Sequence, residues 1–595
     1  MTPPQILKSD PPSWWAGHSI DPLRLMIRGR ALGGARVESA DTDLAFGAPT
    51  VSQNGHYLWV DVSIARAAKP GRRSFKVVTR EGSAEAALEI LAPYPEKGRY
   101  QSFSADDVIY LVMPDRFAQG HGPRPDLGER LNRKLPRSYH GGDLRGVIEK
   151  LPYLKDLGVT ALWLTPLYQN TKQLHPKNAW SDVAFTDYHG YGPIDHYAMD
   201  ESFGDLATLR ALTEKAHSAG MKLILDQVSN HTSQHHPWVG DPPTKGWYHG
   251  TPERHRDNTF QMWVVSDPYA SDELRAGMLD GWFGGILPDL NQDEPELERY
   301  LIQNLMWWIG VCGADGMRHD VVSCVPRGYW RNVFATIKRE YPDFKTIGEV
   351  NGDLPPTVAS YQGRDVGLDS PFDFPLRQAM RAVFLEGQPI ERLPATLSQD
   401  WVYENPSSLV TCFGLHDDSR FMGHPKATIA AIKLAFTFVL TTRGIPLVYY
   451  GNEIALPGGD DPDNRRDFPG GWPDDPRDAF SDKGRTMDEQ DVFEHARALA
   501  RLRAGCEPLR RGSLLNLAVD SQIYAYARLT DAEGAVVALN NADQPRVLSF
   551  DAAPLKAKKF VARVGTVAAP PAGGRFAVEL PARSSAVFTF SRRDS

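Results

Sequence analysis

The sequence predicts an α/β protein: a (β/α)8 barrel with an inserted subdomain after its third strand, and a β-sandwich domain at each end. Three observations support this fold. Eight short apolar runs alternate with helical patterns through the middle of the chain. The interval after the third run is too long for an ordinary loop. Both ends carry short alternating runs bounded by turn residues, which are typical of antiparallel sheets.

Residues 1–95 are predicted to form the N-terminal sandwich. Turns at Gly33-Gly34 and Asn54-Gly55 separate its alternating runs, at residues 23–27, 57–62 and 74–78. Pro93 and the stretch from Pro95 to Gly98 indicate the linker to the next domain.

Residues 96–505 are predicted to form the barrel. Its strands are expected at residues 108–113, 160–164, 222–226, 314–321, 345–350, 366–368, 409–415 and 445–450. Asp143 can cap a helix that Gly158 ends, and further helices are expected from Asp205 to Gly220 and from Pro295. Residues 231–294 form the predicted insertion, and residues 506–595 the C-terminal sandwich, with runs at 523–528, 535–540 and 586–590.

The composition excludes some partners. The net charge of −8 comes from 66 basic and 74 acidic residues without a basic arm, so neither nucleic acid nor an anionic membrane is expected to bind. No apolar stretch is long enough to span a bilayer, which predicts a soluble protein, cytoplasmic as written or periplasmic if a signal peptide has been removed. The four cysteines are expected to be buried free thiols. Sandwich domains at both ends could support a homodimer, although nothing in the sequence demands one.

Acidic residues occupy the ends of four predicted strands, at Asp226, Asp320, Glu349 and Asp417. Catalytic groups of a barrel gather at these ends, and an unpaired buried acid is costly unless it is used. Cleavage of a glycosidic bond with retention needs two carboxyl groups about 5 Å apart, as neighbouring strands can provide. Arg318 lies two residues before Asp320, faces the same side and can hold that aspartate ionised.

Other polar and aromatic residues near the strand ends can bind a sugar. His231, His416 and Asn230 can hydrogen-bond hydroxyl groups, and Tyr191 and Trp282-Phe283 can stack on a pyranose. A single Arg-x-Asp is more often a structural ion pair, so the hypothesis depends on the combination. His175 and His189, in a long loop, are expected to be solvated, and Trp307-Trp308 to pack in the core.

Four motifs resemble those of glycoside hydrolase family 13, the α-amylase family. They are Asp226-Gln-Val-Ser-Asn230-His231, Gly316-Met-Arg318-His-Asp320, Gly348-Glu349-Val and His416-Asp417. The resemblance implies that Asp320 is the nucleophile, Glu349 the general acid/base and Asp417 the third carboxylate. It also implies the substrate-binding residues, namely Tyr191, Asp226, His231, Arg318, His416, Arg420, Trp282 and Arg465.

Within the family, the chain is most similar to cyclomaltodextrinases and neopullulanases. The runs 113–117 and 281–291 and the loop 460–472 carry this likeness, which implies a preference for cyclodextrins, short maltooligosaccharides or pullulan. Ser323 and Cys324 replace the Lys and His of many starch α-amylases, and Leu415 replaces a common Asn.

No cofactor is expected. Asn230 matches a calcium ligand of the family, but the loop after Phe117 lacks the acidic and amide oxygens that calcium prefers, which makes calcium doubtful.

The predicted function is therefore a retaining hydrolase of α-1,4-glucosidic bonds in cyclic or short maltooligosaccharides, with transglycosylation as a side reaction. One alternative is an oligo-1,6-glucosidase or sugar isomerase of the same family. The other is a non-catalytic carbohydrate-binding protein built on the same barrel.

Overall fold

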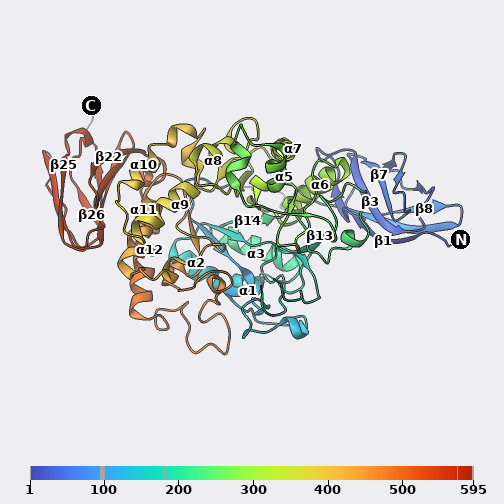
Figure 1. Cartoon of the computed structure of the whole chain (residues 1–595), viewed down its shortest axis with the longest axis horizontal. Helices are drawn as coiled ribbons and strands as arrows, with labels where there is room; N and C mark the ends of the chain where they lie inside the picture. Colours follow the sequence, from blue (N-terminus) through green and yellow to red (C-terminus); the bar gives the residue numbers. More distant parts are fainter. Residues whose placement is uncertain (1, 94–100, 179–180, 572–573, 593–595) are drawn as a thin grey trace.

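A barrel lies at the centre of the molecule, and the two sandwich domains lie on opposite sides of it (Figure 1). The computed structural model describes residues 2–93, 101–178, 181–571 and 574–592. The predicted linker from Pro95 to Gly98 lies outside these residues.

Two sheets form the N-terminal sandwich. One has the order β1-β3-β7-β5 with β6 paired to β7, and the other has the order β2-β9-β8-β4. Their bounds are β1 Gln5–Asp10, β2 Ser13–Trp15, β3 Leu23–Arg30, β4 Arg36–Glu38, β5 Leu44–Phe46, β6 Thr50–Val51, β7 Tyr57–Ile64, β8 Gly71–Thr79 and β9 Gly82–Leu91. The alternating runs predicted from sequence lie in β3, β7 and β8.

Eight parallel strands form the barrel, in the order β10, β11, β14, β17, β18, β19, β20 and β21. Strand β21 pairs back to β10, and a bridge between Phe372 and Val410 closes the ring between β19 and β20. The strands are β10 Ile109–Val112, β11 Ala161–Leu164, β14 Lys222–Gln227, β17 Gly316–His319, β18 Lys345–Gly348, β19 Ser370–Pro371, β20 Val410–Thr411 and β21 Ile445–Tyr449.

The sixth strand differs from its predicted position. Residues 366–368 were expected to form it, but the strand is β19, at Ser370–Pro371. Val366 and Leu368 are buried in the turn that precedes it, where the Leu368 amide donates to the Tyr361 carbonyl. Their apolar character marks burial, which a short run does not distinguish from a strand.

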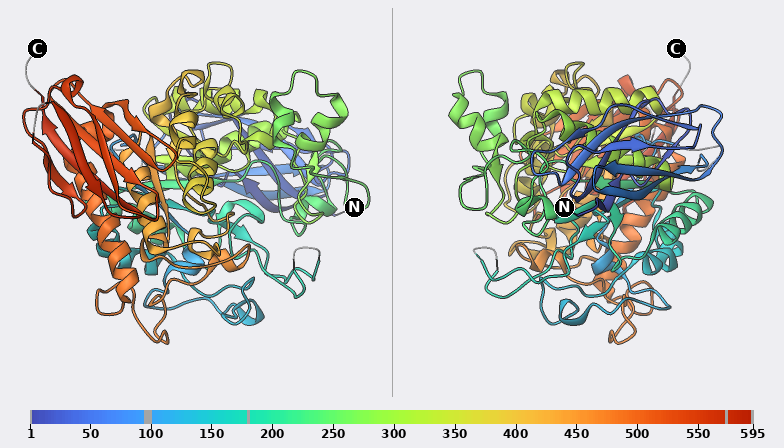
Figure 2. Two further views of the ribbon diagram at one scale, coloured as in Figure 1. Left: turned by 60° about the vertical axis from the view of Figure 1, so that its left-hand side comes forward. Right: turned by 90° about the vertical axis from the view of Figure 1, so that its right-hand side faces the viewer.

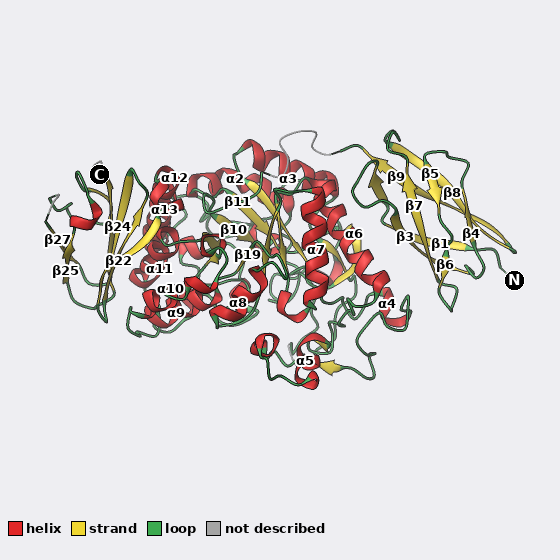
Figure 3. Ribbon diagram, turned by 90° about the horizontal axis from the view of Figure 1, so that it is seen from above, coloured by secondary structure: helices red, strands yellow, loops and turns green. Residues whose placement is uncertain are grey.

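Helices surround the barrel (Figure 3). They are α1 Pro114–Phe117, α2 Leu144–Leu157, α3 Leu206–Ser218, α6 Pro295–Cys312, α7 Arg327–Glu340, α8 Pro355–Gln362, α9 Phe374–Phe384, α10 Arg392–Leu397, α11 Ile429–Thr441, α12 Met487–Gly505 and α13 Glu507–Arg511. The expected ends of α2 are confirmed: an Asp143 side-chain oxygen accepts from the Gly146 amide, and Gly158 adopts φ of 99° after the last turn.

The insertion after β14 projects from the barrel as a small subdomain (Figure 2). Its elements are α4 Pro237–Gly240, β15 Arg256–Asp257, the 3-10 turn η2 Met262–Ser266, α5 Asp272–Leu279 and β16 Gly281–Trp282. Four of its residues, Val264, Met278, Phe283 and Leu287, form a small core with Cys324, which follows β17. Its other buried apolar residues, Trp238, Trp247 and Leu290, belong to the main core. Outside it, β12 (Tyr168–Asn170) pairs with β13 (Pro193–Met199) above the barrel.

The C-terminal sandwich has two sheets. The larger sheet lies between the barrel helices and the smaller sheet, which has two strands. The larger sheet has the order β22-β23-β24-β28-β26, and β25 pairs with β27. On β23, Tyr524 and Tyr526 join the barrel core, while Ala525 and Ala527 join the inner core of the sandwich. The bounds are β22 Ser513–Val519, β23 Ile523–Leu529, β24 Glu533–Asn540, β25 Arg546–Asp551, β26 Val561–Val564, β27 Arg575–Leu580 and β28 Ser584–Ser591.

The cysteine prediction is confirmed, because Cys312, Cys324, Cys412 and Cys506 are all buried and unpaired. Trp307 and Trp308 are also buried, as expected. Across the described segments, no helix is both long and apolar enough to cross a membrane.

Candidate active site

Arg318 gathers three acidic side chains at the carboxyl ends of neighbouring barrel strands. It lies on β17 and is fully buried. Its Nη1 donates to Asp320 Oδ1 at 2.8 Å and to Asp226 Oδ1 at 2.8 Å. Its Nη2 donates to Glu349 Oε2. A single guanidinium therefore contacts both Asp320 and Glu349, which sets these two carboxyl groups side by side.

Two further donors orient Glu349. The Val321 amide donates to Oε2 at 3.1 Å, and Asn351 Nδ2 donates to Oε1 at 3.1 Å. Val321 has a φ of 35°, a left-handed conformation that is costly for a β-branched residue. Strain of this kind persists where the surroundings impose it. Here the left-handed conformation of Val321 directs its own amide at the carboxyl group of Glu349.

Asp226 lies beneath the site. Its Oδ2 accepts from Trp163 Nε1 at 3.0 Å and from the Tyr191 hydroxyl at 2.8 Å. Neither Asp226 nor Arg318 lines the cavity described below. Both were predicted among the substrate-binding residues, but in the structure they hold other residues of the site from below.

Burial changes the protonation of this cluster. It raises the pKa of Asp226 to about 6, against the pull of Arg318. Burial also raises the pKa of Asp320 well above its usual value; Arg318 opposes this shift, and the carboxyl group of Glu349 adds to it. One guanidinium cannot neutralise all these acids, so the cluster keeps a proton at pH values where isolated carboxyl groups have lost theirs.

Asp417 lies at the mouth of the site, with 54% of its side chain exposed. Arg465 Nη2 donates to its Oδ1 at 2.8 Å, and His416 Nε2 lies 3.3 Å from its Oδ2. Burial raises the pKa of Asp417, but the positive charges of Arg465 and Arg318 and the hydrogen bond from Arg465 favour the carboxylate, and the net effect is a lowered pKa. Asp417 is therefore a carboxylate at neutral pH.

The two predicted histidines are neutral. Burial lowers the pKa of His231 and of His416 to about 4 in each case. His231 Nε2 donates to the Tyr191 carbonyl at 2.9 Å, and the ring of His416 stacks on that of Tyr191, with centroids 5.3 Å apart. Neutral imidazoles can donate or accept hydrogen bonds without adding charge.

A cavity of about 430 Å³ brings these groups together. Its lining includes Tyr191, His231, Asp320, Glu349 and His416. A second set, here called the charged wall, is linked by ion pairs and includes Arg137, His189, Asp417, Asp461 and Arg465. A third set is apolar and consists of Phe260, Met262, Val321, Phe283 and Leu287. The cavity that holds Asp320 and Glu349 is therefore lined by both charged and apolar residues.

Sequence reasoning missed part of the charged wall. Arg137 pairs with Asp461 at 2.7 Å, and Asp461 also lies 3.2 Å from Arg465. Arg137 and Asp461 come from loops far apart in the sequence, so no local pattern links them. His189 was expected to be solvated but lines the cavity, with its Nδ1 accepting from the Tyr191 amide at 3.0 Å. His175 was also expected to be solvated, but it is fully buried beside Asp187.

Two predicted binding residues lie away from the cavity. Arg420 is buried behind it, where Nη1 donates to the Tyr450 carbonyl at 2.7 Å and the guanidinium lies over the Tyr449 ring. Trp282 is buried in the subdomain, donates to the His249 carbonyl at 2.7 Å and stacks on His255. Its neighbour Phe283 faces the cavity instead.

The three departures from the family pattern have local explanations. Cys324 belongs to the small core of the subdomain, and Ser323 lies 3.6 Å from the Met262 sulfur. Both therefore face the insertion. Leu415 does line the cavity, and its amide donates to Asp418 Oδ2 at 2.9 Å. Arg377 pairs with the same oxygen at 2.9 Å and brings a cation to this part of the cavity.

Asn230, the residue that matches a calcium ligand of the family, is buried beside Asp289. Its buried Oδ1 has no hydrogen-bond partner, but the nearby carboxylate of Asp289 is bound by His249 at 2.7 Å. Calcium takes six to eight oxygen ligands. Within the described residues, no group of three or more His, Cys, Asp and Glu side chains could hold a metal ion.

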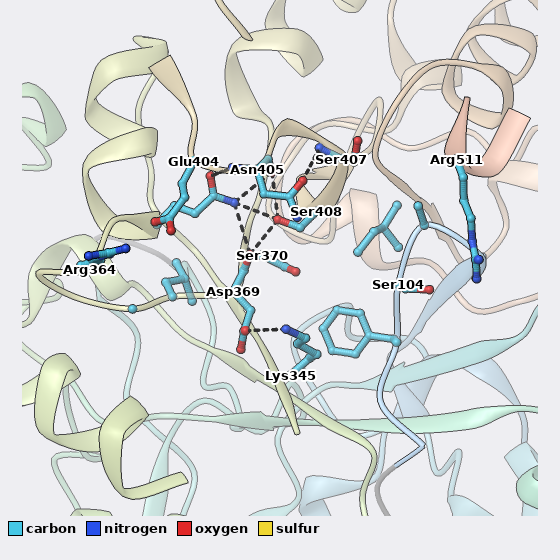
Figure 4. Close-up of a pocket in the computed structure, with 16 residues that line it drawn as sticks. Ser104, Lys345, Arg364, Asp369, Ser370, Glu404, Asn405, Ser407, Ser408 and Arg511 are labelled. Atoms are coloured by element: carbon cyan, nitrogen blue, oxygen red, sulfur yellow. Dashed lines mark hydrogen bonds and ion pairs between the residues drawn. The ribbon is translucent and has the colours of Figure 1, made fainter. Parts of the chain in front are cut away.

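A second cavity, of about 590 Å³, lies at the opposite end of the barrel, where β18, β19 and β21 begin (Figure 4). Its polar groups satisfy one another. Lys345 Nζ donates to Asp369 Oδ1 at 3.0 Å, and Gln362 Nε2 donates to Ser408 Oγ at 2.8 Å. Two acids line it, Asp369 and Glu404, but Asp369 is already paired with Lys338 and Lys345, so the size of this cavity alone does not make it a candidate active site.

Comparisons with known proteins agree with this geometry. Residues 111–501 match the family model for the α-amylase catalytic domain, and residues 8–91 match that for the cyclomaltodextrinase N-terminal domain. Neopullulanase 2 of Thermoactinomyces vulgaris is 30% identical over 74% of this chain and 70% of its own. A cyclomaltodextrinase of Geobacillus thermopakistaniensis is 29% identical over 74% of this chain and 69% of its own. The crystal structure of an α-amylase from Geobacillus thermoleovorans, complexed with acarbose, superposes with a TM-score of 0.68 at 30% identity, covering 82% of this chain and 99% of that one.

Proposed function

This chain belongs to the α-amylase family, glycoside hydrolase family 13, and from that premise we propose that it hydrolyses α-1,4-glucosidic bonds of cyclodextrins and short maltooligosaccharides. Configuration at the anomeric carbon is retained, and transglycosylation is the side reaction. Relatives named neopullulanase and cyclomaltodextrinase support the substrate class, and the match to the cyclomaltodextrinase N-terminal domain adds to this support. Pullulan is a further candidate substrate.

The observation that carries this proposal is the double contact of Arg318 with Asp320 and Glu349. Retaining glycosidases hold their two carboxyl groups about 5 Å apart, whereas inverting enzymes leave roughly 6.5–9.5 Å for a water molecule. Two acids bound to adjacent nitrogens of one guanidinium match the shorter spacing. This supports Asp320 as the nucleophile and Glu349 as the general acid/base.

In the proposed mechanism, Glu349 donates its proton to the glycosidic oxygen while the Asp320 carboxylate attacks the anomeric carbon. The glycosidic bond breaks, the leaving sugar departs with a hydroxyl group, and a glycosyl ester of Asp320 forms. Glu349, now a carboxylate, takes a proton from water as that water attacks the anomeric carbon. Asp320 is released, and Glu349 is protonated again.

Other residues bind the reacting sugar in this proposal. The ionised Asp417 accepts hydrogen bonds from sugar hydroxyl groups at the charged wall, where Arg465 holds it in place. Neutral His231 and His416 contribute further hydrogen bonds, and Tyr191 supports the sugar ring from below. Arg318 and Asp226 position these groups without touching the substrate.

The Asp320→Asn variant tests the assignment. It preserves the shape of the side chain but removes the nucleophile, so turnover of β-cyclodextrin and maltotriose should fall by at least about 10³-fold, the order of loss seen when a covalent catalyst is removed. Circular dichroism controls for folding, and assays of the wild type with EDTA test the proposed independence from metal. Full activity of a folded Asp320→Asn protein would refute the mechanism.

Substrate assays distinguish this proposal from the three alternatives, namely an oligo-1,6-glucosidase, a sugar isomerase and a non-catalytic carbohydrate-binding protein. Faster hydrolysis of isomaltose than of β-cyclodextrin would favour an oligo-1,6-glucosidase, and rearrangement without hydrolysis would favour an isomerase. Binding of β-cyclodextrin without any product would favour a carbohydrate-binding protein. The predicted homodimer and the predicted compartment are tested separately, by sedimentation and by cell fractionation.

A further inference from the structure

The carboxyl group of Glu349 is held by hydrogen-bond donors alone. Its Oε2 accepts from Arg318 Nη2 and from the Val321 amide, and its Oε1 accepts from Asn351 Nδ2 at 3.1 Å. No other group in the described part of the chain hydrogen-bonds to these two oxygens. Three donors suit a carboxylate, which only accepts hydrogen bonds.

The first step of the mechanism needs the other form of Glu349. A protonated carboxyl group donates one hydrogen bond through the oxygen that carries the proton. Oε2 is poorly placed to carry it, because the guanidinium of Arg318 has donors only and the Val321 amide is fixed by its left-handed backbone. The proton of Glu349 is therefore expected on Oε1, the oxygen that Asn351 contacts.

Asn351 can serve both forms of Glu349. A side-chain amide has a nitrogen that donates and an oxygen that accepts, and a half turn about its terminal torsion exchanges their places. Asn351 is half-buried in the loop after β18 and lines the cavity together with Glu349. Among the described residues none hydrogen-bonds to its Oδ1, so the amide can turn this oxygen toward Oε1 without losing another bond.

The charged and titratable neighbours of Glu349 cannot take this role. Arg318 only donates, and Asp320 must remain ionised to attack the sugar. Burial raises the pKa of the Cys324 thiol well above its usual value, so this neighbour stays neutral, and its side chain packs in the small core of the insertion. A neutral amide, by contrast, can reverse its hydrogen bond as the charge of Glu349 changes.

We propose that Asn351 is a positioning residue that supports Glu349 in both protonation states, its Oδ1 accepting from protonated Oε1 before the first step and its Nδ2 donating to the carboxylate before the second. The inference rests on the proposed function, because it takes Glu349 as the acid/base. In the first step the proton on Oε1 passes to the glycosidic oxygen. In the second step Oε1 takes a proton from the attacking water, so the amide turns once in each half of the cycle.

The experiment compares a substrate that needs a proton donor with one that needs little. Maltotriose releases a sugar oxygen that must be protonated, whereas α-maltosyl fluoride releases fluoride. Asn351→Leu keeps the size of the side chain and removes both hydrogen-bonding groups. Its kcat/KM should fall at least about tenfold for maltotriose and at most about threefold for α-maltosyl fluoride, since general acid catalysis supplies about 10²–10⁴-fold. Asn351→Gln, which keeps the amide, should restore part of the loss.

Asn351→Asp separates the two protonation states. Its carboxylate accepts but does not donate, so it supports the acid of the first step and opposes the carboxylate of the second. The kcat/KM for maltotriose should stay within about threefold of the wild type, while kcat for α-maltosyl fluoride, which the second step limits, should fall at least about fivefold. Asn332→Leu is the matched control and should change neither value, because Asn332 Nδ2 donates to the Glu298 carboxylate at 2.6 Å on the exposed surface.

Equal losses on the two substrates in Asn351→Leu would overturn the proposal, because the amide would then bind the sugar and not the acid. Unchanged kinetics in both Asn351→Leu and Asn351→Asp would overturn it as well. Failure of the proposed function gives a different result, namely a wild type that turns over neither substrate. Circular dichroism confirms the folding of each variant, and the isosteric Asn351→Asp tests the proposal even where the leucine variant does not fold.

Discussion

Arg318 determines the protonation state of its neighbours more than any other residue of the site. It is buried and contacts three acidic groups at once. Replacing it would leave buried carboxyl groups without their cation, which is far more costly than losing a surface ion pair. Its role is positioning and charge balance, since it does not reach the cavity.

The Arg318→Gln variant should shift the pH dependence of activity. Asp320 must be ionised to attack, so kcat/KM falls as the pH drops through its pKa, which burial already raises. Removing the opposing charge of Arg318 raises that pKa further, so the acid limb should move up by about one unit or more. Profiles of kcat/KM from pH 4 to 9 measure this, with exposed Arg511→Gln as the control. An unmoved acid limb in a folded variant would contradict the role.

Sequence reasoning identified the acids because strand ends can be predicted, but it could not tell which side chains reach the cavity. Asp226 and Arg318 face inward like Asp320, and only packing shows that they lie beneath the site. Arg420 was predicted among the substrate-binding residues, yet its side chain turns back to the Tyr450 carbonyl. Side-chain direction in a loop is set by tertiary contacts that one sequence does not contain.

At the scale of single elements, the helix ends were the easiest features to predict. Asp143 is an example, because capping depends on a side chain and an amide three residues away. Strand β19 shows the opposite case, since it has two residues and the nearby apolar side chains belong to a turn. The subdomain was predicted only as a long interval, and Phe260, which lies within it, has no local signal that reveals its left-handed backbone.

Asp143→Ala should destabilise the start of α2. Asp143 Oδ1 accepts from the Gly146 amide at 2.8 Å and from the Gly120 amide at 3.1 Å, and the residue is buried. Losing the cap should lower the free energy of unfolding by about 1–2 kcal/mol, measured by urea denaturation. Asp205→Ala, which removes an exposed cap on α3, should cost less. Equal losses of unfolding free energy in the two variants would show that the hydrogen bond from the Gly120 amide adds nothing to the stability.

At the scale of the whole molecule, the N-terminal sandwich is held to the barrel by close contacts along α6. Arg24 binds Glu296 from both Nε and Nη2, and Trp307 Nε1 donates to Ser13 Oγ at 2.9 Å. Buried residues of this sandwich and of the barrel form one continuous hydrophobic core. The predicted boundary near residue 95 thus separates two domains along the sequence, but in the folded chain the N-terminal sandwich and the barrel share one hydrophobic core.

Gly310→Ala tests this packing. A Cβ at Gly310 would lie 2.4 Å from the ring of Trp15, so the sandwich would have to shift. Overpacking costs about 1–3 kcal/mol, whereas Gly to Ala in a helix otherwise gains about 1 kcal/mol. The thermal midpoint should therefore fall. Gly328→Ala on α7 is the matched control, because its Cβ would meet nothing within 4 Å, and it should not lower the midpoint.

Part of the inserted subdomain departs from this shared packing. Val264, Met278, Phe283 and Leu287 form a small cluster with Cys324. Trp238, Trp247 and Leu290, by contrast, join the main core. A region with few buried apolar contacts opens locally at a lower free energy than the body of a protein. Amide hydrogens around α5 should accordingly exchange faster than those of the barrel strands. Phe283 and Leu287 belong to this cluster and also line the active-site cavity, so opening of the cluster would reshape the cavity without unfolding the barrel.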